Sequence, residues 1–372
     1  MGIDRPERDP APVRGERLDT VAAAFRAGER IYRSLGTPLY GALCAGGADD
    51  PDIIELASHG QEGAQPVHLF ASVHYLLLRD SDDPLSRYFA TLTDEPASPE
   101  QAFPEFARFC AKHRDEILPL LENRTVQTTY VERCRALMPP LAQVAKEAGE
   151  PLNLVEIGCS AGVLLAFDKY AYELKGAGRI GIAGAPLTLM TEVRGGPPLY
   201  IPKIGTRIGL DLHPVNVRSA EERQWLLALS FPEFREQQAR LATALDVVAQ
   251  TDIRMLEGDG LALMPAVLAE TPSPLCIFHS TCLFYWSREA KTALDALLMH
   301  ASRSRDIYRI GIEPSERFDS WYAGRADSPE QPQGIAQSSW GEVVIARYRV
   351  GAVDSRVVAH AAWDGGSFEW ID

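Results

Sequence analysis

The sequence predicts an α/β protein in which an all-helical N-terminal domain precedes a sheet of seven strands. Two observations support this prediction. Strand-like and helix-like segments alternate after residue 150. A glycine-rich turn follows the first strand-like segment, and acidic residues follow the next two. The chain has 372 residues, of which 46% are hydrophobic, so it is long enough for two domains with ordinary cores.

The N-terminal part shows helical patterns only. Residues 1–16 are polar and rich in proline and arginine, which predicts a disordered lead. Residues 17–150 carry helix-like apolar patterns separated by turn residues, so we expect a helical domain there and a second domain over 151–372. The lead lacks the apolar segment of a secretory signal, and no apolar stretch reaches the roughly 18 residues of a membrane span. These features predict a cytoplasmic protein.

The second domain has the strand inventory of a Rossmann-like sheet. Strand-like runs lie at 152–157, 208–212, 253–256, 275–279, 307–312, 342–350 and 355–363. Helix-like stretches separate most of the first five runs, which predicts parallel strands with right-handed crossovers. The last two runs are close enough in sequence to form an antiparallel hairpin.

One region interrupts this rhythm between the first and second strands. The apolar residues 163–170 after the first turn predict a helix. Residues 173–205 are rich in glycine and proline, so we expect an inserted hairpin or lid between that helix and the second strand.

The strongest motif is E-I-G-C-S-A-G at residues 156–162. Glycine lets a ligand approach the backbone, and the amides of a following helix would face that ligand. The spacing differs from the G-x-G-x-x-G of dinucleotide folds. It fits the variant of methyltransferases that use S-adenosylmethionine, in which Glu156 would meet the zwitterionic methionine end. The expected cofactor-binding residues here are Glu156, Gly158, Cys159, Ser160 and Gly162. The alternative is a plain tight turn in another doubly wound protein.

Acidic residues at the next two strand ends fit the same cofactor. Asp211 would accept hydrogen bonds from ribose hydroxyls, and the insertion at 173–205 explains why it lies more than the usual 20 or so residues beyond the turn. Asp259 and Gly260 follow the third strand, where a short acidic turn would contact the adenine amino group. The alternative for these aspartates is the capping of a turn.

The fourth strand ends at His279, which is the expected catalytic residue. An unperturbed histidine pKa lies near working pH, so His279 would serve as a general base. A structural hydrogen bond is the alternative role. Weaker candidates for substrate contact are Tyr285, His213, Gln127 and Tyr130, the last two because residues 124–135 join the two domains. A lid there would close over a ligand, and ordinary packing between domains is the alternative.

A serine hydrolase is the second functional hypothesis. Residues 158–162 also satisfy G-x-S-x-G, with Ser160 as the nucleophile and His300 or His360 as the triad histidine. The strand before such a turn normally follows several others, whereas here it opens the α/β domain. A third hypothesis is a binding protein that kept the fold without the chemistry.

The composition of the chain indicates which kinds of binding partner to expect. Acidic residues outnumber basic ones by 51 to 37, giving a formal charge of -14, which disfavours nucleic acid and anionic membranes and favours a small-molecule substrate. The six cysteines form no C-x-x-C pair, and several lie in apolar runs, which predicts reduced, buried thiols. No acidic or histidine cluster predicts a metal site, and the sequence leaves the oligomeric state open.

Most of the chain resembles the bacterial domain-of-unknown-function family 2332 (DUF2332). The resemblance rests on short segments at 73–78, 124–128, 154–165, 209–212, 258–259 and 278–279, together with Pro214. That family is similar in fold to class I S-adenosylmethionine-dependent methyltransferases, so the resemblance implies a methyltransferase sheet and this cofactor. It implies no particular substrate. The family usually has Leu-Asn after the second glycine of the turn, where this chain has Val163-Leu164.

Overall fold

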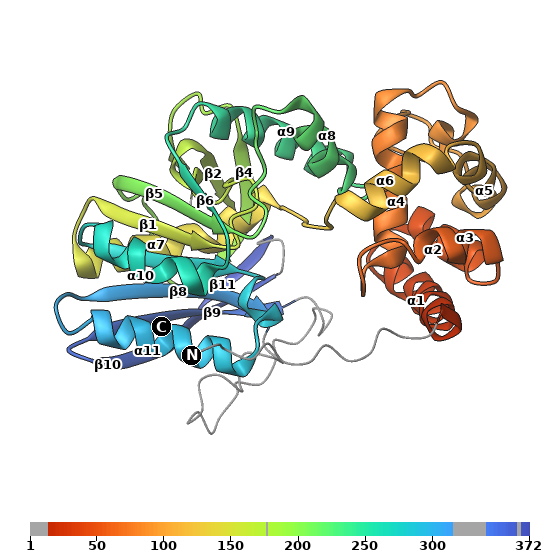
Figure 1. Ribbon diagram of the computed structural model, residues 1–372. Helices are drawn as coiled ribbons and strands as arrows, with labels where there is room; N and C mark the ends of the chain where they lie inside the picture. The colour runs from red at the N-terminus through yellow and green to blue at the C-terminus, as the bar shows by residue number, and fades with distance from the viewer. Residues whose placement is uncertain (1–13, 176–177, 315–339, 363–365) are drawn as a thin grey trace. The chain divides into compact units, whose positions relative to one another are not determined.

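The computed structural model describes residues 14–175, 178–314, 340–362 and 366–372 (Figure 1). The chain divides into two compact units. Unit 1 comprises Met1–Thr128 with Ala220–Ala239, and unit 2 comprises Thr129–Ser219 with Arg240–Asp372. The predicted boundary at residue 150 therefore differs from the structure. A helix before residue 150 belongs to the sheet unit, and a later segment returns to the helical unit.

Helices make up the described part of unit 1. They are α1 (Arg14–Ser34), α2 (Pro38–Gly47), α3 (Pro51–Ala57), α4 (Gln65–Arg79), η1 (Pro84–Tyr88), η2 (Pro99–Gln101), α5 (Phe103–Lys112), α6 (Arg114–Asn123) and α8 (Ala220–Ala228). α9 (Arg235–Ala249) begins in unit 1 and ends in unit 2. Because α1 begins at Arg14, the predicted lead over 1–16 is wrong for its last three residues, and residues 1–13 lie outside the described ranges.

α8 packs against α4 within unit 1, although α8 follows a strand of the sheet in sequence. The buried His74 of α4 hydrogen-bonds the Ala228 carbonyl (3.0 Å) and the Thr91 hydroxyl (2.8 Å). The Gln224 side chain donates to the Tyr75 carbonyl (2.9 Å). α8 is therefore not a crossover helix that packs on the sheet, as its place in the alternating pattern suggested.

Unit 2 contains one eleven-stranded sheet of mixed direction. Its strands are β1 (Leu152–Ile157), β2 (Ala171–Lys175), β3 (Gly178–Gly181), β4 (Thr188–Arg194), β5 (Ile204–Asp211), β6 (Arg254–Glu257), β7 (Leu275–Ser280), β8 (Ile307–Pro314), β9 (Trp340–Arg349), β10 (Ala352–Ala362) and β11 (Ser367–Trp370). Their order is β3-β2-β4-β11-β10-β9-β8-β7-β1-β5-β6. The protein is thus an α/β protein with a largely parallel sheet.

The five parallel strands predicted from the sequence are neighbours in this sheet. They lie in the order β6-β5-β1-β7-β8, and each adjacent pair is parallel. Numbered along the chain as five strands, this is the order 3-2-1-4-5 of doubly wound sheets, in which ligands bind where the order reverses. The reversal falls between β1 and β7, and we call the carboxyl ends of these two strands the switch point.

The remaining strands change the predicted picture of the sheet. The expected final hairpin is present as β9 and β10, with β9 antiparallel to β8; Trp363, at the end of the predicted last run, lies outside the described residues. The hairpin expected in the 173–205 insertion is present as the antiparallel pair of β2 and β3. It does not form a separate lid, because β2, β3 and β4 join the sheet through the pairing of β4 with β11. Seven predicted strands are therefore joined by four more.

The predicted helix over residues 163–170 is wrong. This segment forms turns and the short η4 (Phe167–Lys169). Two buried tyrosines hydrogen-bond carbonyl groups of this segment. The Tyr170 hydroxyl donates to the Val163 carbonyl (3.0 Å), and the Tyr172 hydroxyl donates to the Phe167 carbonyl (2.8 Å). Side-chain bonds thus replace part of the backbone pairing that a helix would provide. The apolar pattern reflects complete burial rather than one face of a helix.

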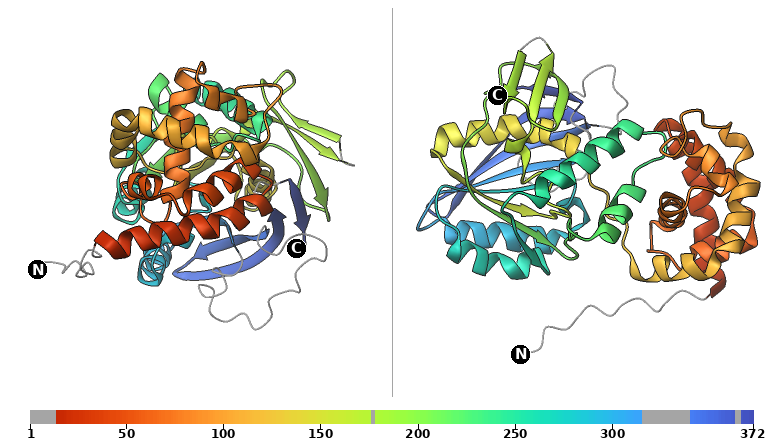
Figure 2. Two further views of the ribbon diagram at one scale, coloured as in Figure 1. Left: turned by 90° about the vertical axis from the view of Figure 1, so that its right-hand side faces the viewer. Right: turned by 90° about the horizontal axis from the view of Figure 1, so that it is seen from above.

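Helices cover both faces of the parallel strands. α10 (Gly260–Glu270) and α11 (Arg288–Ala301) pack on one face, where Val155, Ile277 and Leu210 form a buried cluster with Met264 and Leu294. α7 (Cys134–Ala148) contacts β4, β8 and β9. Figure 2 (right) shows α7 in yellow on one side of the sheet and α10 and α11 on the other. The helices do not cover the carboxyl ends of the strands. η3 (Val131–Arg133) and η5 (Leu283–Tyr285) lie at this edge of the sheet.

None of the helices in the described ranges has both the length and the apolarity needed to cross a membrane. All six cysteines are free thiols, and all but Cys282 are buried.

Candidate functional site

The turns after β1 and β7 touch each other at the switch point. Ile157 pairs with His279 across these parallel strands. Gly158 has φ +78°, and a Cβ at this position would overlap the sulfur of Cys282. Glycine is therefore required here both by the backbone conformation and by the close approach of the second turn.

Two residues at the switch point hold a backbone conformation that L-residues rarely adopt. Ser160, after β1, has φ +49°, and Thr281, after β7, has φ +53°. Hydrogen bonds fix both residues, since the Ser160 carbonyl accepts from the Val215 amide (3.0 Å) and the Thr281 amide donates to the Ile312 carbonyl (2.9 Å). Strain of this kind gathers at functional sites, where the surrounding structure maintains it.

The glycine turn does not present the N-terminus of a helix, which corrects the way the sequence predicted ligand binding. Its amides are instead bonded inside unit 2. The amides of Gly158 and Cys159 donate to the Leu210 carbonyl, and the Gly162 amide donates to the Cys159 carbonyl. A ligand at this turn would therefore depend on side chains around it rather than on helix amides.

Asp211 ties the ends of β1 and β5 together. Its carboxylate is buried, with one oxygen accepting from the Ser160 amide (2.8 Å) and the other from the His213 amide (2.9 Å). Each oxygen keeps a second lone pair. Asp211 therefore has the structural role of holding a turn, which was the alternative predicted for it. Its carboxylate can still accept further hydrogen bonds.

Asp259 caps α10. Its Oδ1 accepts from the Ala262 amide (2.8 Å), and the residue is exposed. Gly260 is buried beside Ile157, and the Gly258 amide donates to the Asp211 carbonyl (2.8 Å). The acidic turn after β6 therefore lies next to the acidic end of β5.

Glu156 is buried near the end of β1 with only 2% of its surface exposed. Burial raises the pKa of its carboxyl well above the usual range, the nearby Asp211 raises it further, and Arg133 opposes both effects. Among the described residues, no group hydrogen-bonds its Oε2 atom. A buried carboxyl oxygen without a partner is uncommon in a folded protein and calls for an explanation.

Arg133 is a site residue that the sequence reasoning missed. It ends η3, its guanidinium lies 5.2 Å from the centre of the buried Tyr130 ring, and its Nη1 donates to the Ser280 carbonyl at the end of β7 (3.5 Å). Its Nε is buried without a partner in the described structure. Burial lowers the pKa of Arg133, against the attraction of Tyr130, Glu313 and Glu156. The sequence did show that this arginine lies in the 124–135 segment, which was predicted to join the two domains and to face the site.

His279 is paired with a second unpredicted residue, Glu313 of β8. The distance between His279 Nδ1 and Glu313 Oε1 is 2.7 Å, and this oxygen also accepts from the amides of Cys282 and Leu283 (3.1 Å each). Burial lowers the pKa of His279, and Glu313 opposes that effect. The ring is therefore neutral with its proton on Nδ1, because a carboxylate only accepts, and its lone pair is on Nε2. His279 has no exposed surface, so contact with a substrate would require the 281–286 turn to move.

The weaker candidates are scattered. Tyr285 is 78% exposed in η5, and His213 is exposed beside Asp211. Tyr130 is buried beneath Arg133, and burial raises its pKa to about 12. Gln127 belongs to unit 1 and is not part of the site as unit 2 defines it.

Four buried polar atoms without hydrogen-bond partners in the described structure gather at the switch point. We call their residues the switch-point cluster: Arg133 (Nε), Glu156 (Oε2), Ser280 (Oγ) and Glu313 (Oε2). They come from η3, β1, β7 and β8. Both a cation and carboxyl groups are represented, so the cluster offers complementary contacts to a ligand that carries both signs of charge.

Ser160 lacks the surroundings of a serine nucleophile. Its hydroxyl accepts from the Thr129 hydroxyl (2.7 Å), and no histidine in the described ranges hydrogen-bonds it. A nucleophile elbow also requires a helix directly after the serine, and turns follow here. We therefore do not carry the hydrolase hypothesis further.

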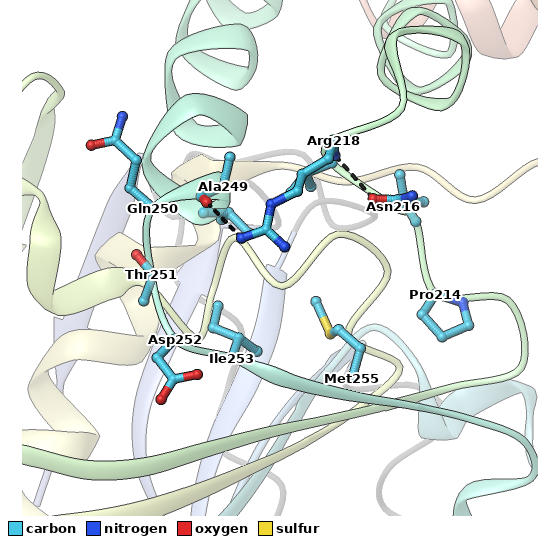
Figure 3. A pocket seen from close by; sticks show the side chains of 12 residues that line it. Pro214, Asn216, Arg218, Ala249, Gln250, Thr251, Asp252, Ile253 and Met255 are labelled. Atoms are coloured by element: carbon cyan, nitrogen blue, oxygen red, sulfur yellow. Dashed lines mark hydrogen bonds between the residues drawn. The ribbon is translucent and has the colours of Figure 1, made fainter.

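A pocket of about 640 Å³ adjoins the turn on the β5–β6 side (Figure 3). Residues 214–218 after β5 and 248–255 around the start of β6 line it. Arg218 closes one side, since its guanidinium donates to the Ala249 carbonyl (3.3 Å) and its amide to Asn216 Oδ1 (3.0 Å). Met255, in the lining, contacts Gly162 of the turn. Asp259 is not among the lining residues, and no pocket residue was predicted from the sequence.

In the part of the chain that the structure describes, no three histidine, cysteine, aspartate or glutamate side chains are grouped as a metal site would require.

The fold and the site define a class: an α/β protein with a doubly wound parallel core and a polar cluster at its switch point. Residues 22–370 match the family described as "Uncharacterized protein conserved in bacteria (DUF2332)", and the chain belongs to that family. No curated protein and no solved structure matches the chain.

Proposed function

We propose that unit 2 binds S-adenosylmethionine along the carboxyl ends of β1, β5 and β6 and transfers its methyl group to a small molecule. The observation that carries this proposal is the switch-point cluster. Its buried cation and carboxyl groups, with unpartnered atoms, lie beside the Gly158 turn. The methionine end of the cofactor is a zwitterion, and a zwitterion is the type of ligand that such a cluster complements.

The residues fit the parts of this cofactor in order along the sheet. Glu156 and the Gly158 turn would hold the methionine end, and Asp211 would accept from the ribose hydroxyls through its remaining lone pairs. Asp259 would approach the adenine with the carboxylate oxygen that does not cap α10. The pocket lined by Met255, on the β5–β6 side of the turn, would offer room for part of the cofactor.

The residues of the chain would contribute mainly by positioning. When bound, S-adenosylmethionine supplies an electrophilic methyl group on a positively charged sulfur. Holding acceptor and donor in line provides a large part of the rate enhancement for such a transfer. His279 would accept the acceptor's proton at Nε2, and Glu313 would keep the ring in that tautomer. The exposed Tyr285 ring lies on the same turn and would border the acceptor.

Calorimetric titration with S-adenosylmethionine and S-adenosylhomocysteine tests the binding step. We expect micromolar affinity for the wild type and a loss of at least about tenfold, or 1.4 kcal/mol, in Glu156→Gln. The matched control is Glu233→Gln. Burial also raises the pKa of Glu233, and no residue that the structure describes hydrogen-bonds its Oε2, but Glu233 lies in unit 1. Unchanged affinity in this control, with far-ultraviolet circular dichroism confirming the fold of both variants, assigns the loss to the site.

No binding to the wild type would overturn the proposal. Binding without conversion of the cofactor to S-adenosylhomocysteine, across a broad panel of small-molecule acceptors, would favour the non-catalytic binding protein instead.

A further inference from the structure

The segment that carries Arg133 crosses the switch point from one strand end to the other. The Thr129 hydroxyl donates to Ser160 Oγ, after β1, at 2.7 Å. Four residues later, Arg133 Nη1 donates to the Ser280 carbonyl at the end of β7 at 3.5 Å. The stacking of the guanidinium 5.2 Å from the Tyr130 ring centre limits its freedom. The segment thus brings a fixed guanidinium to the place where β1 and β7 diverge.

Arg133 has no carboxylate partner among the described residues, unlike two other arginines of unit 2. Arg207 pairs with Asp168 at 2.8 Å, and Arg309 pairs with Asp295 at 3.2 Å. Arg133 makes no ion pair with any described residue, and its Nε has no hydrogen-bond partner. A desolvated guanidinium without a counter-ion is costly, and a planar carboxylate is the group whose geometry suits it best.

The carboxyl groups of the cluster supply the opposite sign close by. Glu156 and Glu313 are 2% and 1% exposed, and both attract Arg133 electrostatically. Each keeps an Oε2 atom with no hydrogen-bond partner in the described ranges. An α-amino acid group carries an ammonium and a carboxylate on the same carbon. A site in which a guanidinium lies near carboxyl oxygens offers a partner to each of these groups.

We propose that Arg133 binds the α-carboxylate of the cofactor's amino-acid end while Glu156 receives its α-ammonium, an inference that rests on the proposed function. Arg133 is thereby the residue that distinguishes a cofactor with an intact amino acid from a nucleoside thioether that lacks one. The charge-assisted bonds involved are among the stronger hydrogen bonds in proteins.

The experiment compares two ligands in four proteins by calorimetry. S-adenosylhomocysteine carries the amino-acid group, and 5′-methylthioadenosine lacks it. We expect the wild type to prefer the first by at least about tenfold. Arg133→Met should lose this preference and keep the affinity for 5′-methylthioadenosine, whereas Arg133→Lys should keep part of the preference. Arg347→Met removes a positive charge elsewhere in unit 2, where Arg347 pairs with Asp306 just before β8, and should change neither affinity.

The outcomes separate the inference from the proposed function. An undiminished preference in Arg133→Met would overturn the inference and leave the proposed function standing. Absence of any binding to the wild type would overturn both. For the case in which Arg133→Met does not fold, the wild type is titrated with the carboxamide of S-adenosylhomocysteine, which removes only the carboxylate charge. Affinity equal to that of the parent ligand would likewise overturn the inference.

Discussion

Two neighbouring parts of one sheet edge use their acidic residues differently. At the ends of β5 and β6, Asp211 accepts two backbone amides and Asp259 caps α10. At the ends of β1, β7 and β8, Glu156 and Glu313 each keep a carboxyl oxygen that no described residue hydrogen-bonds, beside Arg133. The oxygens of the first pair stabilise turns, whereas those of the second group have capacity left for further hydrogen bonds. An acidic residue at a strand end is therefore not by itself a sign of ligand binding. What distinguishes the two cases is whether other groups of the protein already hydrogen-bond the carboxylate oxygens.

The largest expected effect is the loss of stability on removing Asp211. Asp211→Ala leaves the buried Ser160 amide and the part-buried His213 amide without their acceptor. Each hydrogen bond to a charged group contributes about 1.5–3 kcal/mol, so the free energy of unfolding should fall by about 3 kcal/mol. Denaturant unfolding measures this, and Asp211→Asn should recover part of the loss. A change below about 0.5 kcal/mol would show that the carboxylate does not hold the turns together.

The pH dependence of binding should follow Glu156. Burial raises the pKa of its carboxyl in the unliganded protein, and an ammonium partner favours the ionised form. Affinity for S-adenosylhomocysteine should therefore rise with pH, by up to about tenfold per unit, below the α-amino range of about 7.7–8. The groups that interact electrostatically with Glu156 are Arg133, Asp211, the Tyr170 hydroxyl and the thiols of Cys134, Cys159 and Cys282. Proton release measured by calorimetry in two buffers should be absent in Glu156→Gln, and a persisting pH slope in that variant would contradict the assignment.

Glu156→Gln should also stabilise the unliganded protein, the opposite of what Asp211→Ala does. The folded state holds the Glu156 proton more tightly than the unfolded chain, so this residue's contribution is fully present below its unfolded pKa of about 4.3 and is lost as pH rises. The variant should gain about 1 kcal/mol at neutral pH, and the gain should shrink towards acid pH. Urea unfolding at both pH values is the measurement, and an equal effect at both would show that no shifted ionisation is involved.

The smallest effect concerns Asp259. Asp259→Ala removes the cap of α10 and should cost about 1 kcal/mol, whereas Asp259→Ser keeps a capping oxygen. If the carboxylate also contacts adenine, the serine variant should keep its stability and lose several-fold in affinity. Thermal unfolding together with titration separates the two roles, and unchanged affinity in the serine variant would leave Asp259 as a cap alone.

Local patterns predicted much of the fold. The apolar runs at 152–157, 275–279 and 307–312 correspond to β1, β7 and β8 because strands buried on both faces read as continuous apolar stretches. The same reasoning failed at 163–170, where complete burial also gives an apolar run but tyrosine hydroxyls take the carbonyls. The packing of α8 on α4, and the joining of β4 to β11, depend on partners far away in sequence, which no local pattern encodes.

The candidate site was predicted in part. Glu156 and the glycine turn were found because strand, acid and glycine are adjacent in the chain. Arg133 and Glu313 reach the same place from 23 residues before and 157 residues after Glu156, so only the folded sheet brings them together. The sequence could not show that backbone amides already occupy some lone pairs of Asp211 and Asp259. The contacts expected between these aspartates and the ribose and adenine remain predictions.

The most direct test of the central claim is a crystal structure of the protein grown with S-adenosylhomocysteine. The account predicts ligand density over the Gly158–Gly162 turn, with the amino-acid group between Arg133 and Glu156. Density confined to the pocket of residues 214–218 and 248–255, or a ligand whose amino-acid group points away from Arg133 and Glu156, would contradict it.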